Sequence, residues 1–194
     1  MLQWFLVPFA YLLGSLSSAV IVSRLLQLPD PREEGSKNPG ATNVLRLGGK
    51  KAAVITLLGD MFKGLIPLLV AKGLDAPVEI LAAAGVAAFL GHLYPVFFGF
   101  RGGKGVATAL GVLLGYSWVT GTAVLVTWLV VAYFSRMSSL SALIAAALAP
   151  VYVGWWLGGL PLVSATVLMS ALLIWRHREN IARIRRGEES RIGR

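Results

Sequence analysis

"VATALGVLLGYSWVTGTAVLVTWLVVAYFS", residues 106–135, is an apolar run of 30 residues without a charged side chain. One helix of about 30 residues would be about 45 Å long, whereas the hydrocarbon core of a bilayer is about 30 Å thick. The run is therefore too long for a single membrane span. We expect it to break near Gly115-Tyr116-Ser117 and to form a short helix followed by a full one.

The rest of the chain has the same apolar character. Hydrophobic residues make up 56% of the 194 residues and charged residues 14%, whereas a soluble domain usually carries about 25% charged residues. We therefore predict one all-α domain, residues 1–194, that crosses a membrane with seven transmembrane helices. The further apolar runs are Leu2–Val22, Ala52–Val70, Val78–Leu90, Leu140–Leu157 and Pro161–Trp175.

The positive charges predict the orientation. With seven spans and the N-terminus outside, four polar segments share the cytoplasmic side and carry nearly all of the Lys and Arg residues, as the positive-inside rule requires. Lys72 then lies outside and Lys63 within a span. Six spans would separate Arg136 and the C-terminal arginines from the other cations. The four segments are Pro29–Lys51, Gly91–Lys104, Arg136–Ser139 and Arg176–Arg194.

Several residues within the predicted spans have structural explanations. The pairs Gly111/Gly115 and Gly154/Gly158 have the four-residue spacing that lets helices approach closely. Asp60 and Lys63 are three residues apart inside the second run. Opposite charges at this spacing neutralise each other on a helix, so we interpret them as a structural pair.

The composition excludes several kinds of chemistry. The chain has no cysteine and two histidines, and His, Asp and Glu do not cluster at metal-ligand spacing. We therefore predict no catalytic metal and no cofactor. There is no Gly-x-Ser-x-Gly motif for a serine nucleophile. In a membrane protein the net charge of +9 favours anionic lipid head groups as partners, and we predict no binding to nucleic acid.

The first polar segment, "LPDPREEGSKNPGATNVLRLGGKK" (residues 28–51), is rich in turn-forming residues. Its second half is compatible with a helix that places Asn43 and Arg46 on one face. A solvated loop would explain Lys50 and Lys51 but not the density of hydroxyl and amide groups around Arg46. The candidate binding residues here are Ser36, Lys37, Asn38, Thr42, Asn43 and Arg46.

The second polar segment, "GFRGGKGVAT" (residues 99–108), combines glycines with Lys104 before a predicted helix. Glycines allow backbone N–H groups to approach an anion, and a helix N-terminus attracts negative charge. We predict an anion nest of Gly102, Gly103 and Gly105 with Lys104; a tight turn between spans is the alternative. The segment is not a Walker A loop, because Phe98 and Gly105 replace residues that this motif requires.

The C-terminal segment, "WRHRENIARIRRGEES" (residues 175–190), places His177 and Asn180 three residues apart, on one face of a helix. A basic helix lying on anionic lipid would explain its arginines but neither of these two residues. His177 is a candidate for acid–base chemistry, or for hydrogen bonding alone. We interpret His92 as a satisfied structural donor, and Ser141 as a residue that lines a polar pocket or caps a helix.

Together these segments favour a site for one or two phosphates at the edge of a membrane. An enzyme that uses an activated acyl donor needs orientation and charge stabilisation but no covalent nucleophile. A transporter of an organic phosphate is one alternative, although no internal repeat is visible. A lipid phosphatase is another, although a nucleophile or metal cluster is missing.

The blocks "GSLSSAV", "GSKNPGATNVLR", "GHLYPVFFGFRGGKGVAT" and "RHRENIARIRRGEE" closely resemble the bacterial acyl-phosphate:glycerol-3-phosphate acyltransferases, the PlsY family. The resemblance covers essentially the whole chain. It implies a seven-helix enzyme of the bacterial inner membrane with its active site on the cytoplasmic face. The implied reaction transfers an acyl group from acyl phosphate to the 1-hydroxyl of sn-glycerol 3-phosphate. Its products are lysophosphatidic acid and phosphate, in the first step of phospholipid synthesis.

The resemblance also implies the roles of individual residues. It assigns catalytic roles to Ser36, Arg46, Lys104, His177 and Asn180. We expect the glycine nest and Lys104 to hold the phosphate of the acyl donor. The other four would hold glycerol 3-phosphate and orient its hydroxyl, while the acyl chain lies between helices. The general base is either His177 or a substrate phosphate oxygen, and we expect the protein to act as a monomer.

Overall fold

The computed structural model describes residues 2–193, and its regular elements in this range are all helical. The expectation of an all-α fold is therefore confirmed. The elements are η1 (Leu2–Phe5), α1 (Leu6–Gly14), α2 (Ser18–Leu25), α3 (Ala41–Gly73), α4 (Val78–Leu93), η2 (Val96–Phe98), α5 (Val106–Tyr116), α6 (Trp118–Ser135), α7 (Ser138–Trp156), α8 (Leu160–Arg176) and α9 (Arg178–Arg185).

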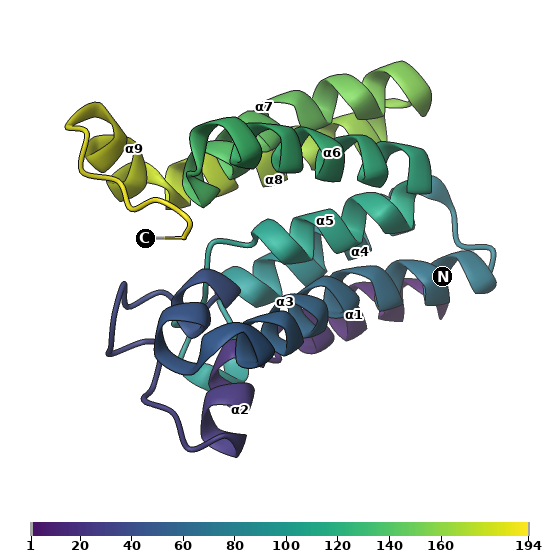
Figure 1. Ribbon diagram of the computed structural model, residues 1–194. Helices are drawn as coiled ribbons and strands as arrows, with labels where there is room; N and C mark the ends of the chain where they lie inside the picture. The colour runs from purple at the N-terminus through teal and green to yellow at the C-terminus, as the bar shows by residue number, and fades with distance from the viewer. Residues whose placement is uncertain (1, 194) are drawn as a thin grey trace.

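The longer helices lie side by side along one direction, and the two termini lie at opposite ends of the bundle (Figure 1). Helix α3 packs against α5, α1 against α4, and α6 against α7, while α8 contacts both α4 and α7. Large apolar side chains remain exposed on the outside, such as Trp155 (83%) and Phe134 (81%). Such a surface suits lipid and not water.

Four helices are long and apolar enough to cross a membrane, namely α3, α4, α6 and α7. Each of the bent pairs α1/α2 and α8/α9 forms one further candidate span, which gives up to six. Helix α5 has 11 residues and is therefore only about 16 Å long. Before α5 begins, the chain from Gly102 to Gly105 packs against the end of α4.

The predicted break in the long apolar run is confirmed. Helix α5 ends at Tyr116 and α6 begins at Trp118, with Ser117 accepting a hydrogen bond from the backbone N–H of Val119 at 3.2 Å. The serine thus caps the second helix. Nζ of Lys72 donates to the carbonyl of Tyr116 at 2.9 Å. Lys72, the cation that we expected outside the membrane, therefore satisfies a backbone carbonyl at the C-terminal end of α5.

Two further breaks were not expected from the sequence. The first apolar run bends by 41° between α1 and α2, where Oγ of Ser15 bonds back to the carbonyl of Tyr11 at 2.8 Å. Within α3, Gly49 leaves the helical conformation at φ 76°. Residues 41–48 therefore form a separate short helical piece, and this piece carries Arg46 into the polar end of the bundle.

Close helix contact explains one of the two glycine pairs. A Cβ added at Gly111 would collide with the carbonyl of Met61, and one at Gly115 would lie 2.6 Å from Cβ of Leu68. This pair lets α5 approach α3 as predicted. The prediction was wrong for the other pair, because an added Cβ finds its nearest atom at 4.0 Å at Gly154 and none within 4 Å at Gly158.

This difference provides a matched stability test. We expect Gly111→Val to lower the melting temperature in detergent by roughly 5–10 °C, since overpacking costs about 1–3 kcal/mol and 1 kcal/mol corresponds to about 2–4 °C in a chain of this size. Gly154→Val should change the melting temperature by less than about 2 °C. Equal losses in the two variants would contradict the observed packing of α5 on α3.

Candidate active site

Four segments that are far apart in the sequence meet at one end of the bundle, which we call the polar end. It consists of residues 28–48, 99–105, 136–139 and 176–192. Oγ1 of Thr42 lies 3.4 Å from Oγ of Ser138, and Oγ of Ser139 donates to Oε1 of Glu189 at 2.7 Å. The backbone N–H of Ile192 donates to the carbonyl of Arg136 at 2.6 Å. The predicted convergence of these segments is therefore present.

Asn43 holds the first segment in shape. Its Nδ2 donates to the carbonyls of Pro31 and Glu34, both at 2.9 Å, and its Oδ1 accepts from the backbone N–H of Ser36 at 2.9 Å. The side chain is buried, and these bonds occupy both of its ends. Our expectation of a substrate contact at Asn43 therefore gives way to a structural role: it supports the loop that presents Ser36.

The remaining candidates of this segment lie near the surface. Ser36, Lys37 and Thr42 are exposed, and Asn38 is half-buried. Arg46 is exposed on the short piece of α3, where its Nη2 donates to Oγ of Ser190 at 2.6 Å. The guanidinium thus has a neutral partner, so it can exchange this hydroxyl for an anion.

The glycine segment packs more tightly than the predicted nest. A Cβ at Gly102 would collide with the carbonyl of His92, and one at Gly103 with Nε2 of the same histidine. The N–H of Gly103 donates to the carbonyl of His92 at 3.3 Å, so it does not face a ligand. Gly105, at φ 87°, precedes the first turn of α5. Of the predicted nest, Lys104 and the N-terminus of α5 therefore remain as candidate groups for binding an anion.

Arg176, which the sequence did not single out, holds this segment from the other side. Its Nη2 donates to the carbonyls of Gly102 at 2.8 Å and Gly103 at 3.1 Å. The two glycines are thus fixed between α4 and the end of α8. Lys104, the next residue, extends from a segment whose position is held on two sides.

Lys104 reaches the C-terminal segment. Its Nζ donates to Oδ1 of Asn180, and the side chain is partly buried. Burial, with the nearby charge of Arg183, lowers the pKa of Lys104 to about 8. The ammonium group is protonated at neutral pH but weakly solvated, which favours direct contact with a phosphate.

His177 lies at the bend between α8 and α9, where the axis turns by 56°. We expected His177 and Asn180 on one face of a helix at the end of the last span; the chain instead bends at His177, which flanks both α8 and α9, and Asn180 lies in α9. Nδ1 of His177 lies 2.8 Å from the carbonyl of Leu173, so it must carry the hydrogen and leave Nε2 as an acceptor. Burial lowers the pKa of His177 to about 4, and the ring is neutral at physiological pH.

The C-terminal segment contributes residues that the sequence did not identify. Glu189 is buried and accepts hydrogen bonds from Nδ2 of Asn180 at 2.6 Å, from Ser139, and from Nε of Arg183 at 2.7 Å. Burial alone would raise the pKa of Glu189, but these bonds outweigh it and hold the pKa below its usual value. Glu189 therefore fixes the amide of Asn180, whose oxygen faces Lys104.

Ser141 does not take part in this network. Its hydroxyl is fully buried in α7 and donates to the carbonyl of Met137 at 2.8 Å. The proposed substrate contact at Ser141 is therefore unsupported, and Ser139 is the serine of this helix that faces the C-terminal segment. Within residues 2–193, no three His, Asp or Glu side chains form a group that could hold a metal ion.

The lowered pKa of Lys104 predicts a pH effect. Above about pH 8 the group loses its proton and its attraction for phosphate, so kcat/KM should fall up to about tenfold per pH unit. Initial rates from pH 6.5 to 9.5 measure this limb. In Lys104→Arg the limb should move beyond the measured range, because a guanidinium stays charged. A fall of kcat/KM at the same pH in this variant would contradict the attribution of the pH effect to Lys104.

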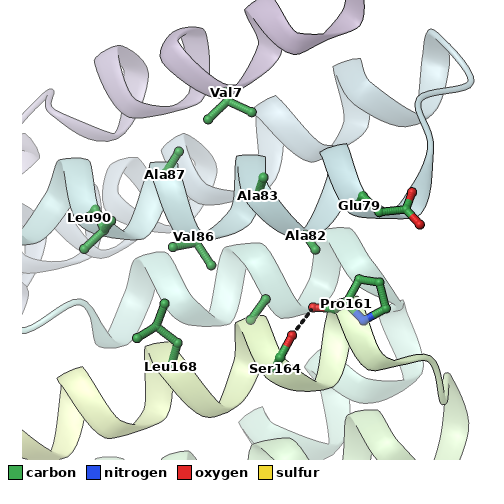
Figure 2. A pocket seen from close by; sticks show the side chains of 11 residues that line it. Val7, Glu79, Ala82, Ala83, Val86, Ala87, Leu90, Pro161, Ser164 and Leu168 are labelled. Carbon is green, nitrogen blue, oxygen red and sulfur yellow. Dashed lines mark hydrogen bonds between the residues drawn. The ribbon is translucent and has the colours of Figure 1, made fainter.

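A separate apolar cleft of about 500 Å³ lies between α1, α4 and α8 (Figure 2). Val7 lines it from α1, Val86 and Leu90 from α4, and Leu168 from α8. Glu79 lies at one end of the cleft, and none of the predicted polar site residues lines it. Leu168 is nine residues before His177, about 13 Å along the helix.

The fold and these two features define an integral membrane protein with a cation-rich polar end and an apolar cleft among its helices. Residues 4–187 match the sequence profile of the glycerol-3-phosphate acyltransferase family. The chain therefore belongs to this family and is an integral membrane enzyme.

Two relatives show how far the similarity extends. A glycerol-3-phosphate acyltransferase of Methylococcus capsulatus is 68% identical over 191 residues, which is 98% of this chain and 96% of that protein. One of Thioalkalivibrio sulfidiphilus is 62% identical over 188 residues, which is 97% of this chain and 93% of that protein.

Two solved structures have the same fold. Both are of PlsY (YgiH), an integral membrane glycerol 3-phosphate acyltransferase, in its glycerol 3-phosphate form and in its lysophosphatidic acid form. The TM-scores are 0.94 and 0.91, at 40% and 39% identity, and each comparison covers 100% of this chain and 96% of the other.

Proposed function

We propose that this enzyme transfers a fatty acyl group from acyl phosphate to the 1-hydroxyl of sn-glycerol 3-phosphate. The hydroxyl oxygen attacks the carbonyl carbon of the donor, and the bond from this carbon to the phosphate oxygen breaks. The products are 1-acyl-sn-glycerol 3-phosphate and inorganic phosphate, as the first step of phospholipid synthesis. The observation that carries the proposal is the meeting of Lys104, Asn180 and Arg46 with the C-terminal segment at one polar end.

Two cations provide places for two phosphates. Lys104, beside the N-terminus of α5, would hold the phosphate of the donor. Arg46 would release the hydroxyl of Ser190 and bind the phosphate of glycerol 3-phosphate. Ser36 and Asn180 would then lie close to the hydroxyl groups of this substrate. The glycerol 3-phosphate and lysophosphatidic acid forms of the related PlsY structures support this acceptor and this product.

The acyl chain needs an apolar path, and the cleft between α1, α4 and α8 is a suitable one. Its lining is almost entirely aliphatic, and its inner end at Leu90 and Leu168 lies on the two helices that lead to the polar end. A chain placed there would remain in the bilayer while its phosphate reaches Lys104.

His177 is poorly suited to be the base that removes the hydroxyl proton. Its pKa of about 4 makes Nε2 a weak acceptor of a full proton, although a good acceptor of a hydrogen bond. We propose that a substrate phosphate oxygen takes the proton and that Nε2 of His177 orients the hydroxyl.

The variant His177→Gln tests this division of roles. Glutamine places a hydrogen-bonding amide near the position of Nε2 without titrating. We expect kcat to fall by about 10-fold, whereas loss of a general base usually costs about 10²–10⁴-fold. His177→Ala should lose more than the Gln variant. A loss in His177→Gln as large as in His177→Ala would make the histidine the base.

We further propose seven spans, with α5 as the short seventh, the N-terminus outside and the C-terminus in the cytoplasm. This arrangement agrees with the opposite positions of the termini (Figure 1) and with the concentration of cations at the polar end. It places the active site on the cytoplasmic face of the bacterial inner membrane. A single chain supplies every residue of the proposed site, so we expect a monomer to be active.

One assay tests the reaction. Purified protein in detergent is given acyl phosphate, with and without glycerol 3-phosphate, and released phosphate is measured. We expect release only when both substrates are present. Release without the acceptor would indicate a phosphatase instead, and no release with either mixture would favour transport of an organic phosphate.

A further inference from the structure

A group of buried charged side chains lies within the bundle, outside the proposed site. Asp60 and Lys63 of α3 form an ion pair at 2.8 Å, and both are buried, with exposures of 2% and 4%. Oδ1 of Asp60 also lies 3.7 Å from Nδ1 of His92 on α4. The predicted local pair is therefore present, but it has a third member from another helix.

His92 is not the satisfied donor that we expected. Among the described residues, its Nδ1 has no hydrogen-bond partner, and Oδ1 of Asp60 is likewise without one apart from the ion pair. Buried polar groups normally have partners, and each one without a partner calls for an explanation. Such charges within a membrane-spanning helix are also costly and are retained where they have a role.

The group is connected to both neighbouring breaks in the chain. Nζ of Lys63 donates to the carbonyl of Leu16 at 2.7 Å, in the bend between α1 and α2. On the other side, the carbonyl of His92 accepts from the N–H of Gly103, and its ring lies directly against the Cα of this glycine. Gly103 immediately precedes Lys104.

We propose that Asp60 is a positioning residue for the acyl transfer. Its carboxylate lies 3.7 Å from Nδ1 of His92, an electrostatic and packing contact without a hydrogen bond. Through this contact it would orient the ring that lies against Gly103, and thereby set the position of Lys104. Arg176 fixes the same segment from the opposite side through the carbonyls of Gly102 and Gly103. The inference rests on the proposed role of Lys104, but its structural part can be measured without turnover.

The test must avoid leaving one buried charge alone, because an unpaired buried charge strongly destabilises a protein. The double variant Asp60→Leu/Lys63→Met removes both charges and keeps a similar side-chain volume. Proteins often tolerate such a replacement of a buried ion pair. His92→Leu removes the ring that links the pair to Gly103 while leaving the ion pair intact. Melting temperature in detergent shows whether each variant is folded.

Hydrogen–deuterium exchange measures the position of the segment directly. We expect the amides of residues 99–107 to exchange at least about tenfold faster in both variants, with α6 unchanged as the internal control. In the same samples kcat/KM should fall by about 20-fold or more, as the rate depends on where Lys104 is held. The triple variant should differ little from the double variant or from His92→Leu alone, because all three substitutions act through one contact.

The outcomes separate the inference from the proposed reaction. Unchanged exchange of residues 99–107 in a folded double variant would overturn the positioning role, whatever the activity. Faster exchange throughout the chain would also overturn it, since the charges would then support the fold only. Faster exchange confined to residues 99–107 supports the positioning role of Asp60. A wild-type enzyme without turnover would count against the proposed acyl transfer alone.

Discussion

Replacing Lys104 with Met is expected to lower kcat/KM by about 10³-fold. Removing one partner of a buried charge pair costs about 2–5 kcal/mol, and 1.4 kcal/mol corresponds to tenfold. Lys104 is partly buried at the N-terminus of α5, where no other cation donates to Asn180 in the part of the chain that the structure describes. Steady-state kinetics with each substrate varied in turn measures the loss.

Two matched variants make this prediction specific. Lys50→Met removes an exposed lysine of the same charge, and we expect less than about a twofold change, as for most surface substitutions. Lys104→Arg keeps the charge but not the shape, so an intermediate loss of about 10-fold is expected. Retention of more than a tenth of wild-type kcat/KM in Lys104→Met would show that the lysine does not hold a reacting phosphate.

Arg46→Met is expected to raise KM for glycerol 3-phosphate by about 10²-fold, with a smaller effect on kcat. A hydrogen bond to a charged group contributes about 1.5–3 kcal/mol, and a phosphate accepts two from one guanidinium. Because Arg46 is exposed, the loss should appear mainly in binding of the soluble substrate. Initial rates over a range of glycerol 3-phosphate concentrations separate KM from kcat.

Ser190→Ala is the control for Arg46. In the structure the guanidinium donates to the hydroxyl of Ser190, so a role limited to holding the C-terminal segment would make the two variants equally poor. If Arg46 binds phosphate, Ser190→Ala should stay within about twofold of wild type, because it removes one neutral partner only. Equal KM increases in both variants would contradict the phosphate role.

The parts of the fold that follow from local chemistry were predictable. The break between α5 and α6 follows from bilayer thickness, and it lies within the three residues expected. The helix start before Arg46 and the ion pair of Asp60 with Lys63 follow from residue type and spacing. Each depends on residues within one or two turns of one another.

The details of the site depend on contacts between distant segments. Glu189 and Ser190 lie in a basic tail without a periodic pattern, and they take part only because the tail folds back over α7 and α3. Arg176 takes part because α8 ends beside the glycine segment that follows α4. Ser141, which we expected to line a polar pocket or to cap a helix, bonds within α7, whereas Ser139 faces the C-terminal segment, because two residues along a helix are about 200° apart around its axis. Two glycines of the predicted nest, Gly102 and Gly103, pack closely on His92, and Gly105 packs on Phe89, contacts that no local pattern indicates.

The identity of the acyl donor and of the acylated hydroxyl is the central claim. Phosphorus NMR of purified protein with acyl phosphate and glycerol 3-phosphate measures both, with the corresponding acyl-CoA as the alternative donor in a parallel sample. We predict equal amounts of inorganic phosphate and 1-acyl-sn-glycerol 3-phosphate from acyl phosphate, and no product from acyl-CoA. Product formation from acyl-CoA at a comparable rate, or acylation of the 2-hydroxyl, would contradict the account.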